Sequence, residues 1–330
     1  MGLTIAIPTY DRNQKLVSLL HRLRPQIVAN VSIVVIDNFS PTPVSITLAE
    51  QPELAELPLF VYRNEANIGI SANIIRSFEL SQGTWVWLLG DDDDILPDAV
   101  SNILASISNI ETNVCAINFS TGLLDYTLKA PRTQDVRLDG RNFSQSLDCF
   151  ANFLFIAANV LRRDYLLPYM ASTLGYLGSG THIIPSLYRA IYDANLTIIL
   201  SSLRICNYSP KKGGNDWSKE FEVLFYDGLD CIPDYSDRRA IARKIARWHS
   251  PVGPRRMSRW IFISQDYGLV FANLKATSYV SIPRCVLLML LVIVESTVNT
   301  LTGELFRNMV KHRSDRYIYT PFVRGKRPRD

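Results

Sequence analysis

The sequence predicts an α/β fold built on a mainly parallel sheet, followed by a helical, basic C-terminal region. Short apolar strands alternate with helical segments over residues 3–89, which is the pattern of βαβ units. Polar residues stand where these strands end. From residue 217 onward the pattern indicates helices alone. We therefore expect two parts, a sheet-containing domain at residues 1–205 and a helical region at residues 206–330.

The elements before residue 90 follow from apolar periodicity and from capping residues. The predicted strands are Leu3–Pro8, Val31–Ile36, Leu59–Tyr62 and Thr84–Leu89. The predicted helices are Asn13–Leu23, which carries leucines on one face, and a second helix that Ser71 caps and that runs to Leu80. Parallel sheets bind ligands at the carboxyl ends of their strands. The polar clusters at residues 9–11, 37–38 and 91–94 all fall at such ends, so we expect them to form one site.

The second part of the sheet domain is predicted from shorter runs. Strands are expected at Val114–Phe119, Leu123–Leu128 and Leu196–Ile205, and a helix at His182–Asn195.

Four consecutive aspartates, Asp91 to Asp94, follow the fourth predicted strand. Carboxylates this close repel one another unless a cation lies between them. Oxygen ligands of this kind suit Mg²⁺ or Mn²⁺, ions that proteins usually share with substrate phosphates. The alternative is a solvated acidic turn that caps a helix beginning near Pro97.

Cysteine usage and the N-terminus favour the cytoplasm. The five cysteines show no C-x-x-C spacing, which argues against a disulfide framework or a zinc site and for a reducing compartment. The first residues lack the basic and apolar stretches of a signal peptide.

Positive charge is concentrated in the C-terminal third. The formal net charge is only +4, yet residues 238–259 hold eight Arg and Lys and no Asp or Glu. This asymmetry indicates an anionic partner. No nucleic-acid-binding motif is present, so a membrane surface or a lipid diphosphate is favoured over nucleic acid.

Two C-terminal segments bear on membrane attachment. Ser236–His249 is a basic helix with Ile241, Ile245 and Trp248 on one face. Cys285–Val294 is an unbroken apolar run, too short for the about twenty residues that span a bilayer. Each segment has two interpretations, an ordinary helix packed on the core or an interfacial helix on an anionic membrane. The second would place the protein peripherally on the inner face of the cell membrane.

Four blocks of residues together resemble family 2 glycosyltransferases, which have the GT-A fold. The blocks are TIAIPTYDR at residues 4–12, IVVIDNFS at 33–40, NIG at 67–69 and GTWVWLLGDDDDILP at 83–97. They occur in the family's order and spacing, whereas the rest of the chain resembles the family only loosely. The resemblance implies that a sugar is transferred, with inversion, from a nucleotide-diphosphate donor to an acceptor.

The resemblance also assigns residues to the donor site. It implies that the following lie beside the nucleotide: Pro8, Thr9, Tyr10, Asp11, Asn67 and Gly69. Asp37 is implied to hydrogen-bond the base or ribose. In the DXD motif, Asp91 and Asp93 are implied to bind Mg²⁺ or Mn²⁺, with Asp93 as the direct ligand. Asp92 is expected to face the ribose, and Asp94 to support the site without touching the donor.

The general base departs from the family's pattern. The family supplies an Asp or Glu at the start of a helix that follows the DXD motif. Here that region reads GSGTHIIPSL at residues 178–187 and has no carboxylate. His182 is its only titratable group, and imidazole is a competent base near neutral pH. We predict His182 as the base, with a locally hydrogen-bonded His182 as the alternative and Asp216 as the fallback base. The arginine that many relatives carry after the N-x-G segment is also missing; Ala72 and Asn73 stand there.

Other functions fit fewer of these features. A nicotinamide oxidoreductase is disfavoured because Gly178 and Gly180 lack the third glycine of its fingerprint. A metal-dependent nucleotidyl or phosphoryl transferase could also use clustered aspartates. A catalytically inactive sugar-nucleotide-binding module would explain the missing acidic base. The expected role is sugar transfer in bacterial surface polysaccharide assembly, onto a saccharide or a lipid-linked saccharide acceptor.

Overall fold

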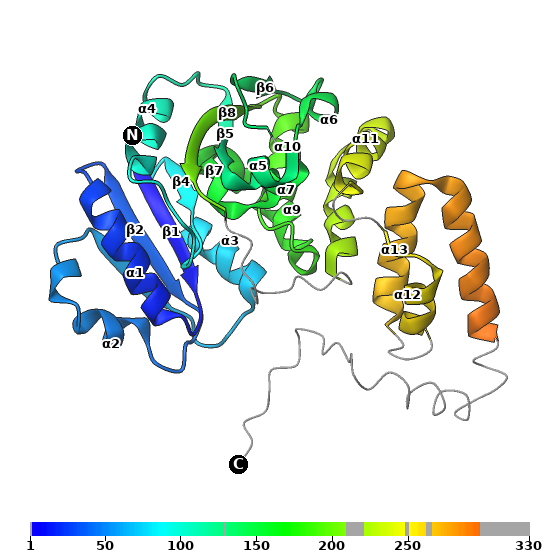
Figure 1. Ribbon diagram of the computed structural model, residues 1–330, viewed down its shortest axis with the longest axis horizontal. Helices are drawn as coiled ribbons and strands as arrows, with labels where there is room; N and C mark the ends of the chain where they lie inside the picture. The colour runs from blue at the N-terminus through cyan, green and yellow to red at the C-terminus, as the bar shows by residue number, and fades with distance from the viewer. Residues whose placement is uncertain (1, 129, 209–220, 248–250, 262–265, 298–330) are drawn as a thin grey trace, which may run out of the picture. The chain divides into compact units, whose positions relative to one another are not determined.

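The computed structural model describes residues 2–128, 130–208, 221–247, 251–261 and 266–297 (Figure 1). The chain divides into two compact units, which are described separately. One comprises Met1–Asp216 and Gly228–Trp248, and the other Trp217–Asp227 and His249–Asp330. The domain boundary predicted at residues 205 and 206 stays a prediction.

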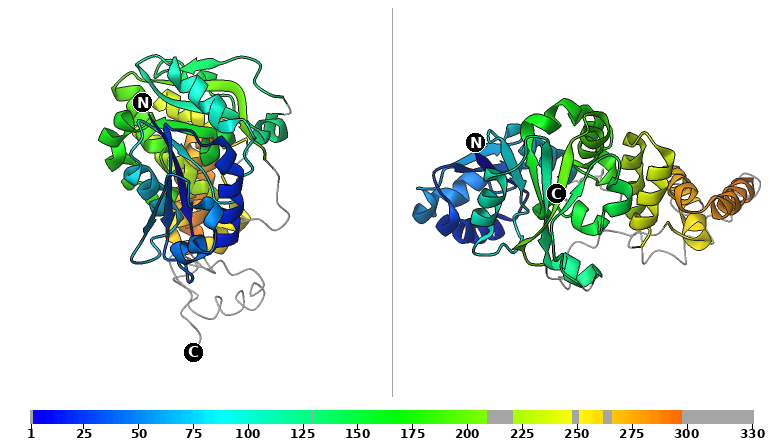
Figure 2. Two further views of the ribbon diagram at one scale, coloured as in Figure 1. Left: turned by 90° about the vertical axis from the view of Figure 1, so that its left-hand side faces the viewer. Right: turned by 90° about the horizontal axis from the view of Figure 1, so that it is seen from above.

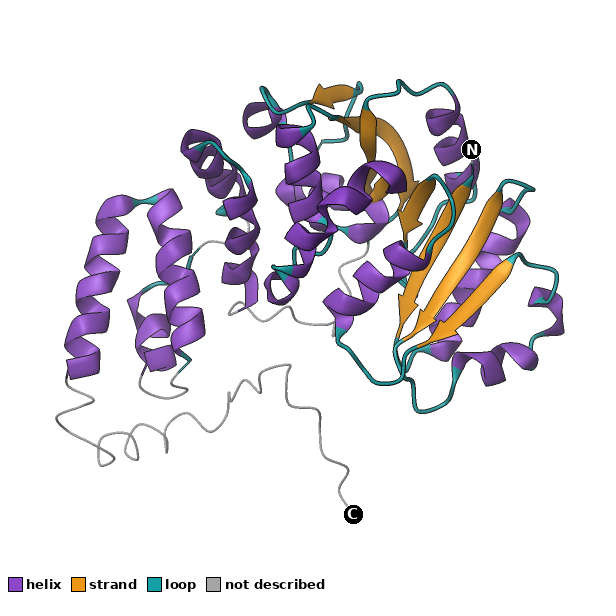
Figure 3. Ribbon diagram, turned by 180° about the vertical axis from the view of Figure 1, so that it is seen from behind, coloured by secondary structure: helices purple, strands orange, loops and turns teal. Residues whose placement is uncertain are grey.

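An eight-stranded sheet forms the centre of the first unit (Figures 1 and 3). The strands are β1 (Leu3–Thr9), β2 (Val31–Asp37), β3 (Leu59–Arg63), β4 (Trp85–Leu88), β5 (Val114–Thr121), β6 (Val136–Leu138), β7 (Asn159–Arg162) and β8 (Thr197–Cys206). Their spatial order is β3-β2-β1-β4-β7-β5-β8-β6. β1 pairs parallel with β2 and β4, β2 with β3, and β5 with β8, whereas β7 and β6 pair antiparallel with their neighbours. The predicted, mainly parallel sheet is confirmed.

Helices lie on both sides of this sheet (Figure 2). The helices of the first unit are α1 (Asn13–Leu23), α2 (Val44–Ala49), α3 (Ile70–Leu80), α4 (Ala99–Ser108), α5 (Gly122–Leu128), α6 (Phe143–Ser146), α7 (Phe150–Leu154), α8 (Arg163–Leu166), α9 (Met170–Leu174), α10 (Ile184–Asp193) and α11 (Tyr235–Ile245). The first predicted helix has the bounds of α1. The second begins one residue before Ser71, and Gly69 is its N-cap residue.

The predicted strand at Leu123–Leu128 is wrong, because these residues belong to helix α5. β5 ends at Thr121, whose Oγ1 accepts the N–H of Leu123 at 3.2 Å, a bond of the kind that starts a helix. A Cβ on Gly122 would lie 2.5 Å from the backbone nitrogen of Tyr208. The chain therefore turns out of the sheet where only glycine fits against the segment that follows β8.

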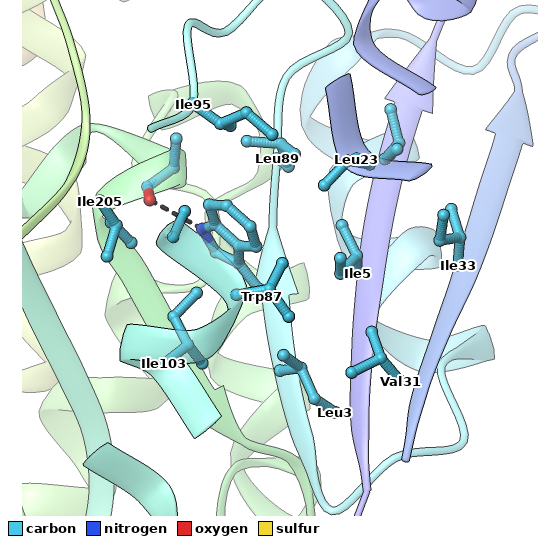
Figure 4. Close-up of a cluster of buried hydrophobic side chains, with 14 of the residues drawn as sticks. Leu3, Ile5, Leu23, Val31, Ile33, Trp87, Leu89, Ile95, Ile103 and Ile205 are labelled. Atoms are coloured by element: carbon cyan, nitrogen blue, oxygen red, sulfur yellow. Dashed lines mark hydrogen bonds between the residues drawn. The ribbon is translucent and has the colours of Figure 1, made fainter. Parts of the chain in front are cut away.

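A continuous apolar core fixes the positions of the strand ends (Figure 4). Ile5 and Ile33 pack on one face of the sheet against Leu23 of α1 and Ile103 of α4. Trp87 is fully buried among them, and its indole N–H donates to the carbonyl oxygen of Ala157 at 2.8 Å. The loops that follow β1, β2 and β4 are thereby anchored on a rigid base.

Helix α11 is the described part of the predicted basic helix, and it packs on the first unit through Ile241 and Ile245. Trp248, the third predicted apolar residue, lies outside the described residues. The ammonium of Lys244 donates to the carbonyl oxygens of Gln145 and Leu147. One of the positive charges of α11 is therefore used in contacts within the protein.

The second unit is helical, as predicted. It contains part of the 3₁₀ segment Phe221–Cys231, α12 (Pro254–Arg259), α13 (Tyr267–Val280) and a helix at residues 282–297. Its core gathers the side chains of Val223, Val252, Met257, Trp260, Ile261, Leu269, Val270 and Leu288. Among the described helices, none combines the length and apolarity needed to cross a bilayer.

The turn after β5 can be tested by adding one methyl group. We expect Gly122→Ala to lower the free energy of unfolding by about 1–3 kcal/mol, because its Cβ meets backbone that cannot rotate away. Gly178→Ala is the matched control, since a Cβ there has no neighbour within 4 Å. Urea unfolding of both variants measures the difference. Equal stability of the two would contradict this packing.

Candidate active site

The carboxyl ends of three parallel strands bring the predicted polar clusters together. Thr9 of β1 stands beside Asp37 of β2, which stands beside Arg63 of β3. Backbone hydrogen bonds continue past the strands: the N–H of Asn38 donates to the carbonyl of Thr9, and the N–H of Asn64 to that of Asp37, each at 2.9 Å. The loop after β4 joins this edge, because β4 is the other neighbour of β1.

Asp91 is the most enclosed of the four aspartates. It is 4% exposed, and its Oδ2 accepts the hydroxyl of Thr9 at 2.6 Å. Burial raises the pKa of Asp91, and the hydrogen bond from Thr9 and the charge of Arg12 counteract that rise only in part. Asp91 is therefore a carboxylate whose charge needs a cation.

Arg12 supplies a positive charge between two of the aspartates. Its Nη1 lies 3.3 Å from Oδ1 of Asp91 and 3.3 Å from Oδ2 of Asp92. Lys15 lies 3.2 Å from the same oxygen of Asp92. Sequence reasoning assigned no role to Arg12 or Lys15, although Arg12 directly follows the predicted donor residues of the first turn. Asp91 and Asp92 thus point to one cationic position.

Asp93 and Asp94 have other partners. Oδ2 of Asp93 accepts the N–H of Gly90 at 2.6 Å, and a Cβ on Gly90 would lie 2.8 Å from that oxygen. Asp94 pairs with Arg22 at 2.8 Å and accepts the side-chain amide of Asn207 at 3.0 Å. Asp93, the predicted direct metal ligand, therefore also closes the turn after β4 through its bond with the N–H of Gly90.

Asp37 is held by donors of the protein. It accepts the N–H of Ser40 at 2.8 Å and that of Val44 at 3.2 Å, and it forms an ion pair with Arg63. Burial alone would raise the pKa of Asp37, but the hydrogen bonds from Ser40, Val44 and Arg63 outweigh it and lower the pKa. Asp37 therefore shapes the loop after β2, whatever contact it makes with the donor.

A ladder of asparagines links that loop to the N-x-G segment. The amide of Asn38 donates to Asn67 at 2.8 Å, and the amide of Asn64 donates to both Asn38 and Asn73 at 2.9 Å. Asn73 donates to the carbonyl of Ile36 at 3.1 Å. Gly69 has a φ of 84°, the left-handed region that favours glycine. The segment is thus positioned by contacts among these amides that the sequence alone did not predict.

Two aromatic side chains are exposed at this edge. Tyr10 is 44% and Phe39 48% exposed. Phe39 has a φ of 66°, unusual for a bulky residue, and the guanidinium of Arg63 lies 4.9 Å from its ring centroid. Such strain in an exposed aromatic residue points to function rather than to packing.

His182 lies in the turn between Gly180, which is in the left-handed region, and α10, so the helix predicted to begin at His182 begins at Ile184. It is itself strained, with a φ of 48°, and its imidazole is buried. Within the described residues its Nδ1 has no hydrogen-bond partner. Burial lowers the pKa of His182 to about 4, so the ring is neutral at pH 7. The fallback base, Asp216, lies outside the described residues.

The aspartates suit a divalent cation that is shared with a ligand. Among the described residues, no group of three or more His, Cys, Asp or Glu could hold a metal ion alone. Mg²⁺ bound with substrate phosphates needs only one or two carboxylates, because phosphates and waters complete its octahedron. The position between Asp91 and Asp92, where Arg12 already places a positive charge, meets that requirement.

Comparison with known proteins identifies the domain that carries this site. Residues 4–166 match the family described as Glycosyl transferase family 2. An uncharacterized glycosyltransferase of Haemophilus influenzae is 30% identical over 105 residues, 32% of this chain and 34% of the relative. Abequosyltransferase RfbV of Salmonella typhimurium is 28% identical over 103 residues, 31% of each chain. The aligned segment therefore spans about a third of these relatives.

Solved structures share the fold over a longer stretch. S. aureus TarS 1-349 in complex with UDP superposes with a TM-score of 0.61 at 15% identity, covering 99% of this chain and 95% of that one. The complex of the same protein with UDP-GlcNAc gives 0.59 at 16% identity, covering 85% and 82%. The fold is thus the GT-A fold expected from the four sequence blocks, and the segment at residues 4–166 matches glycosyl transferase family 2.

Proposed function

We propose that this protein transfers a sugar, with inversion, from a nucleotide-diphosphate donor to the hydroxyl group of an acceptor. The observation that carries the proposal is the convergence of Asp91, Asp92 and Arg12 at the carboxyl ends of β1 and β4, inside the segment that matches the family. Two similar proteins fit a sugar-transfer role, one named as an abequosyltransferase and one crystallised with UDP-GlcNAc.

The donor is proposed to lie over the edge formed by β1, β2 and the N-x-G segment. Pro8 and Thr9 end β1, Tyr10 and Asp11 follow it, and Asn67 and Gly69 stand just before α3. The exposed ring of Phe39, supported by Arg63, offers a stacking surface for the base. Asp37 orders this surface through Arg63 and Ser40, and any contact with the ribose comes in addition.

Mg²⁺ or Mn²⁺ is proposed at Asp91, together with Asp92 and Asp93. The ion supplies positive charge to the diphosphate, which becomes more negative as the glycosidic bond breaks. Thr9 fixes the orientation of Asp91, and Arg12 and Lys15 keep Asp92 within the same charged cluster. The assignment of Asp93 as direct ligand stays a prediction, and the geometry adds Asp92 as a competing ligand.

His182 is proposed to accept the proton of the acceptor hydroxyl. The buried Nδ1 of its ring has no hydrogen-bond partner among the described residues, and an unsatisfied buried nitrogen in a strained residue fits a functional role. Burial lowers the pKa of His182 to about 4, so the ring is in the neutral form that can accept a proton at pH 7.

The acceptor is proposed to be a saccharide, free or linked to a lipid, in the assembly of a bacterial surface polysaccharide. Transfer onto a lipid carrier takes place at a membrane, so we propose the anionic inner face of the cell membrane as the working surface. The basic residues of the C-terminal third are the features that support it.

One screen tests the proposal as a whole. Purified protein is incubated with UDP-, GDP- and dTDP-sugars, with Mn²⁺ or EDTA, and binding and donor hydrolysis are measured. We expect at least one donor to bind and hydrolyse slowly, with the metal required. Binding without any hydrolysis would indicate an inactive binding module, and release of nucleoside monophosphate would indicate a nucleotidyl or phosphoryl transferase.

The aspartates can be separated by single substitutions. Asp91→Asn is expected to lower turnover by about 10² or more, the scale for losing a main electrostatic contributor. Asp92→Asn and Asp93→Asn are compared over a range of Mn²⁺ concentrations, and the direct ligand is the one whose loss raises the Mn²⁺ concentration needed for half-maximal turnover. Asp98→Asn, an exposed carboxylate that makes no capping bond, is the control. Near-normal turnover of the Asp91, Asp92 and Asp93 variants would contradict the proposed metal site.

His182 predicts a pH dependence of stability. The unfolded chain takes up a proton below about pH 6.5, whereas folded His182 does so only near its pKa of about 4. The free energy of unfolding should therefore fall as pH drops from about 6.5 to 4, and His182→Gln should lose part of that fall. Urea unfolding at several pH values measures it. An unchanged slope in the variant would show that His182 is not buried in the neutral form.

The same residue predicts a loss of transfer. His182→Ala should lower sugar transfer by about 10²–10⁴ while donor binding stays nearly unchanged, because the base contacts the acceptor. Transfer at the wild-type rate would show that another group or solvent takes the proton.

A further inference from the structure

The helix at residues 282–297 exposes an apolar face. Seven large apolar side chains on it are between 49% and 62% exposed: Ile282, Val286, Leu287, Met289, Leu290, Ile293 and Val294. At 100° per residue these positions fall within an arc of about 160°, which is one continuous side of a helix. Figure 1 shows this helix alongside α13. Scattered apolar residues on a surface need no explanation, but a contiguous apolar face marks an interaction site.

The opposite side of the same helix is docked onto the second unit. Cys285 and Leu288 are buried there, and Leu288 belongs to that unit's core. The thiol of Cys285 donates to the carbonyl of Leu274 at 3.3 Å, and Ser258 of α12 hydrogen-bonds Glu295. The helix is therefore held in place, and its outer face does not contribute to the core of this unit.

Basic residues lie near this helix, beside its docked side. Arg284 lies on the helix itself and donates to the carbonyl of Pro251, just before α12. α12 runs alongside and carries Arg255, Arg256 and Arg259, of which Arg255 is exposed. Residues 249–330 contain thirteen Lys and Arg against five Asp and Glu. In a dimer, the positive charges of the two copies would repel each other, whereas an anionic lipid surface would attract them.

The length of the helix determines how it meets lipid. Sixteen described residues extend about 24 Å, shorter than the roughly 30 Å hydrocarbon core of a bilayer. One side of this helix is packed on the protein and the other side is apolar. A helix of this kind lies parallel to the membrane surface, at the boundary between headgroups and acyl chains.

We propose that the helix at residues 282–297 is a membrane-docking element, which inserts its apolar face between lipids while Arg255, Arg256 and Arg284 meet anionic headgroups. The proposal names the surface by which the protein reaches the membrane in the proposed function. It stands without that function, because no residue of the donor site takes part. Apolar insertion and charge attraction are the two signals that stable peripheral attachment generally needs.

The test is flotation of the full-length protein with vesicles of phosphatidylcholine alone or with phosphatidylglycerol, at low and high salt. We expect binding to the anionic vesicles, weakening at high salt and poor on neutral ones. The triple variant L287Q/L290Q/I293Q should lose tenfold or more in apparent affinity. V28Q/I46Q/L174Q is the matched control, because it changes three side chains of similar exposure in the first unit, and it should bind as the wild type does.

Two further arms make the result decisive. R255Q/R256Q should weaken binding at low salt, and donor hydrolysis should be unchanged in every variant, so failure of docking and failure of catalysis are distinguishable. If the triple variant misfolds by circular dichroism, L287Q and L290Q are measured singly, each with an expected several-fold loss. Wild-type protein that stays unbound, or a triple variant that binds normally, would overturn the proposal. So would a dimer that the triple variant dissolves, since a second copy would then cover the face.

Discussion

Neutralisation of the carboxylates after β4 is the constraint on which the candidate site depends. Four acidic side chains on consecutive residues cannot share one environment without a large electrostatic cost. The structure gives each its own set of partners, with Arg12 shared by the first two: Thr9 and Arg12 for Asp91, Arg12 and Lys15 for Asp92, the N–H of Gly90 for Asp93, and Arg22 for Asp94. Three of these partners are cations from α1 and the turn before it. Helix α1 thus has two roles, since its leucines cover the sheet and its cations hold the acidic loop.

This arrangement explains why the loop can be rigid before any donor binds. Arg22 also donates to the carbonyl of Asp93 at 2.7 Å, and the N–H of Asn207 donates to that of Asp94 at 2.8 Å. The turn is therefore tied both to α1 and to the segment that follows β8. A loop fixed at both ends keeps Asp91 and Asp92 directed at one position, and preorganised charge of that kind needs little rearrangement when a ligand arrives.

The sequence predicted the parallel strands and their polar ends well, because short apolar, β-branched runs bounded by turn residues are typical of buried strands such as β1, β2 and β4. It failed at Leu123–Leu128, where a short apolar run fits strand and helix equally and the outcome depends on how Gly122 meets the backbone of Tyr208. The family blocks located Asp37 and Asn67, but their contacts with Arg63 and Asn38 arise from residues that are distant in sequence. Strand register and loop packing create such pairs, and no local pattern encodes them.

Burial acts on both Asp91 and His182, two titratable residues of the proposed mechanism with shifted pKa values. It raises the pKa of Asp91 and lowers that of His182, so it favours the neutral form of each. For His182 the neutral ring is the form that can accept a proton. For Asp91 the neutral form is the one that cannot bind a metal, so a cation must stabilise the carboxylate against the cost of burial. Arg12 does this in part, and a divalent ion that arrives with a diphosphate would do it more strongly. The same desolvation thus favours the proton-accepting form of His182 and makes the carboxylate of Asp91 dependent on a nearby cation.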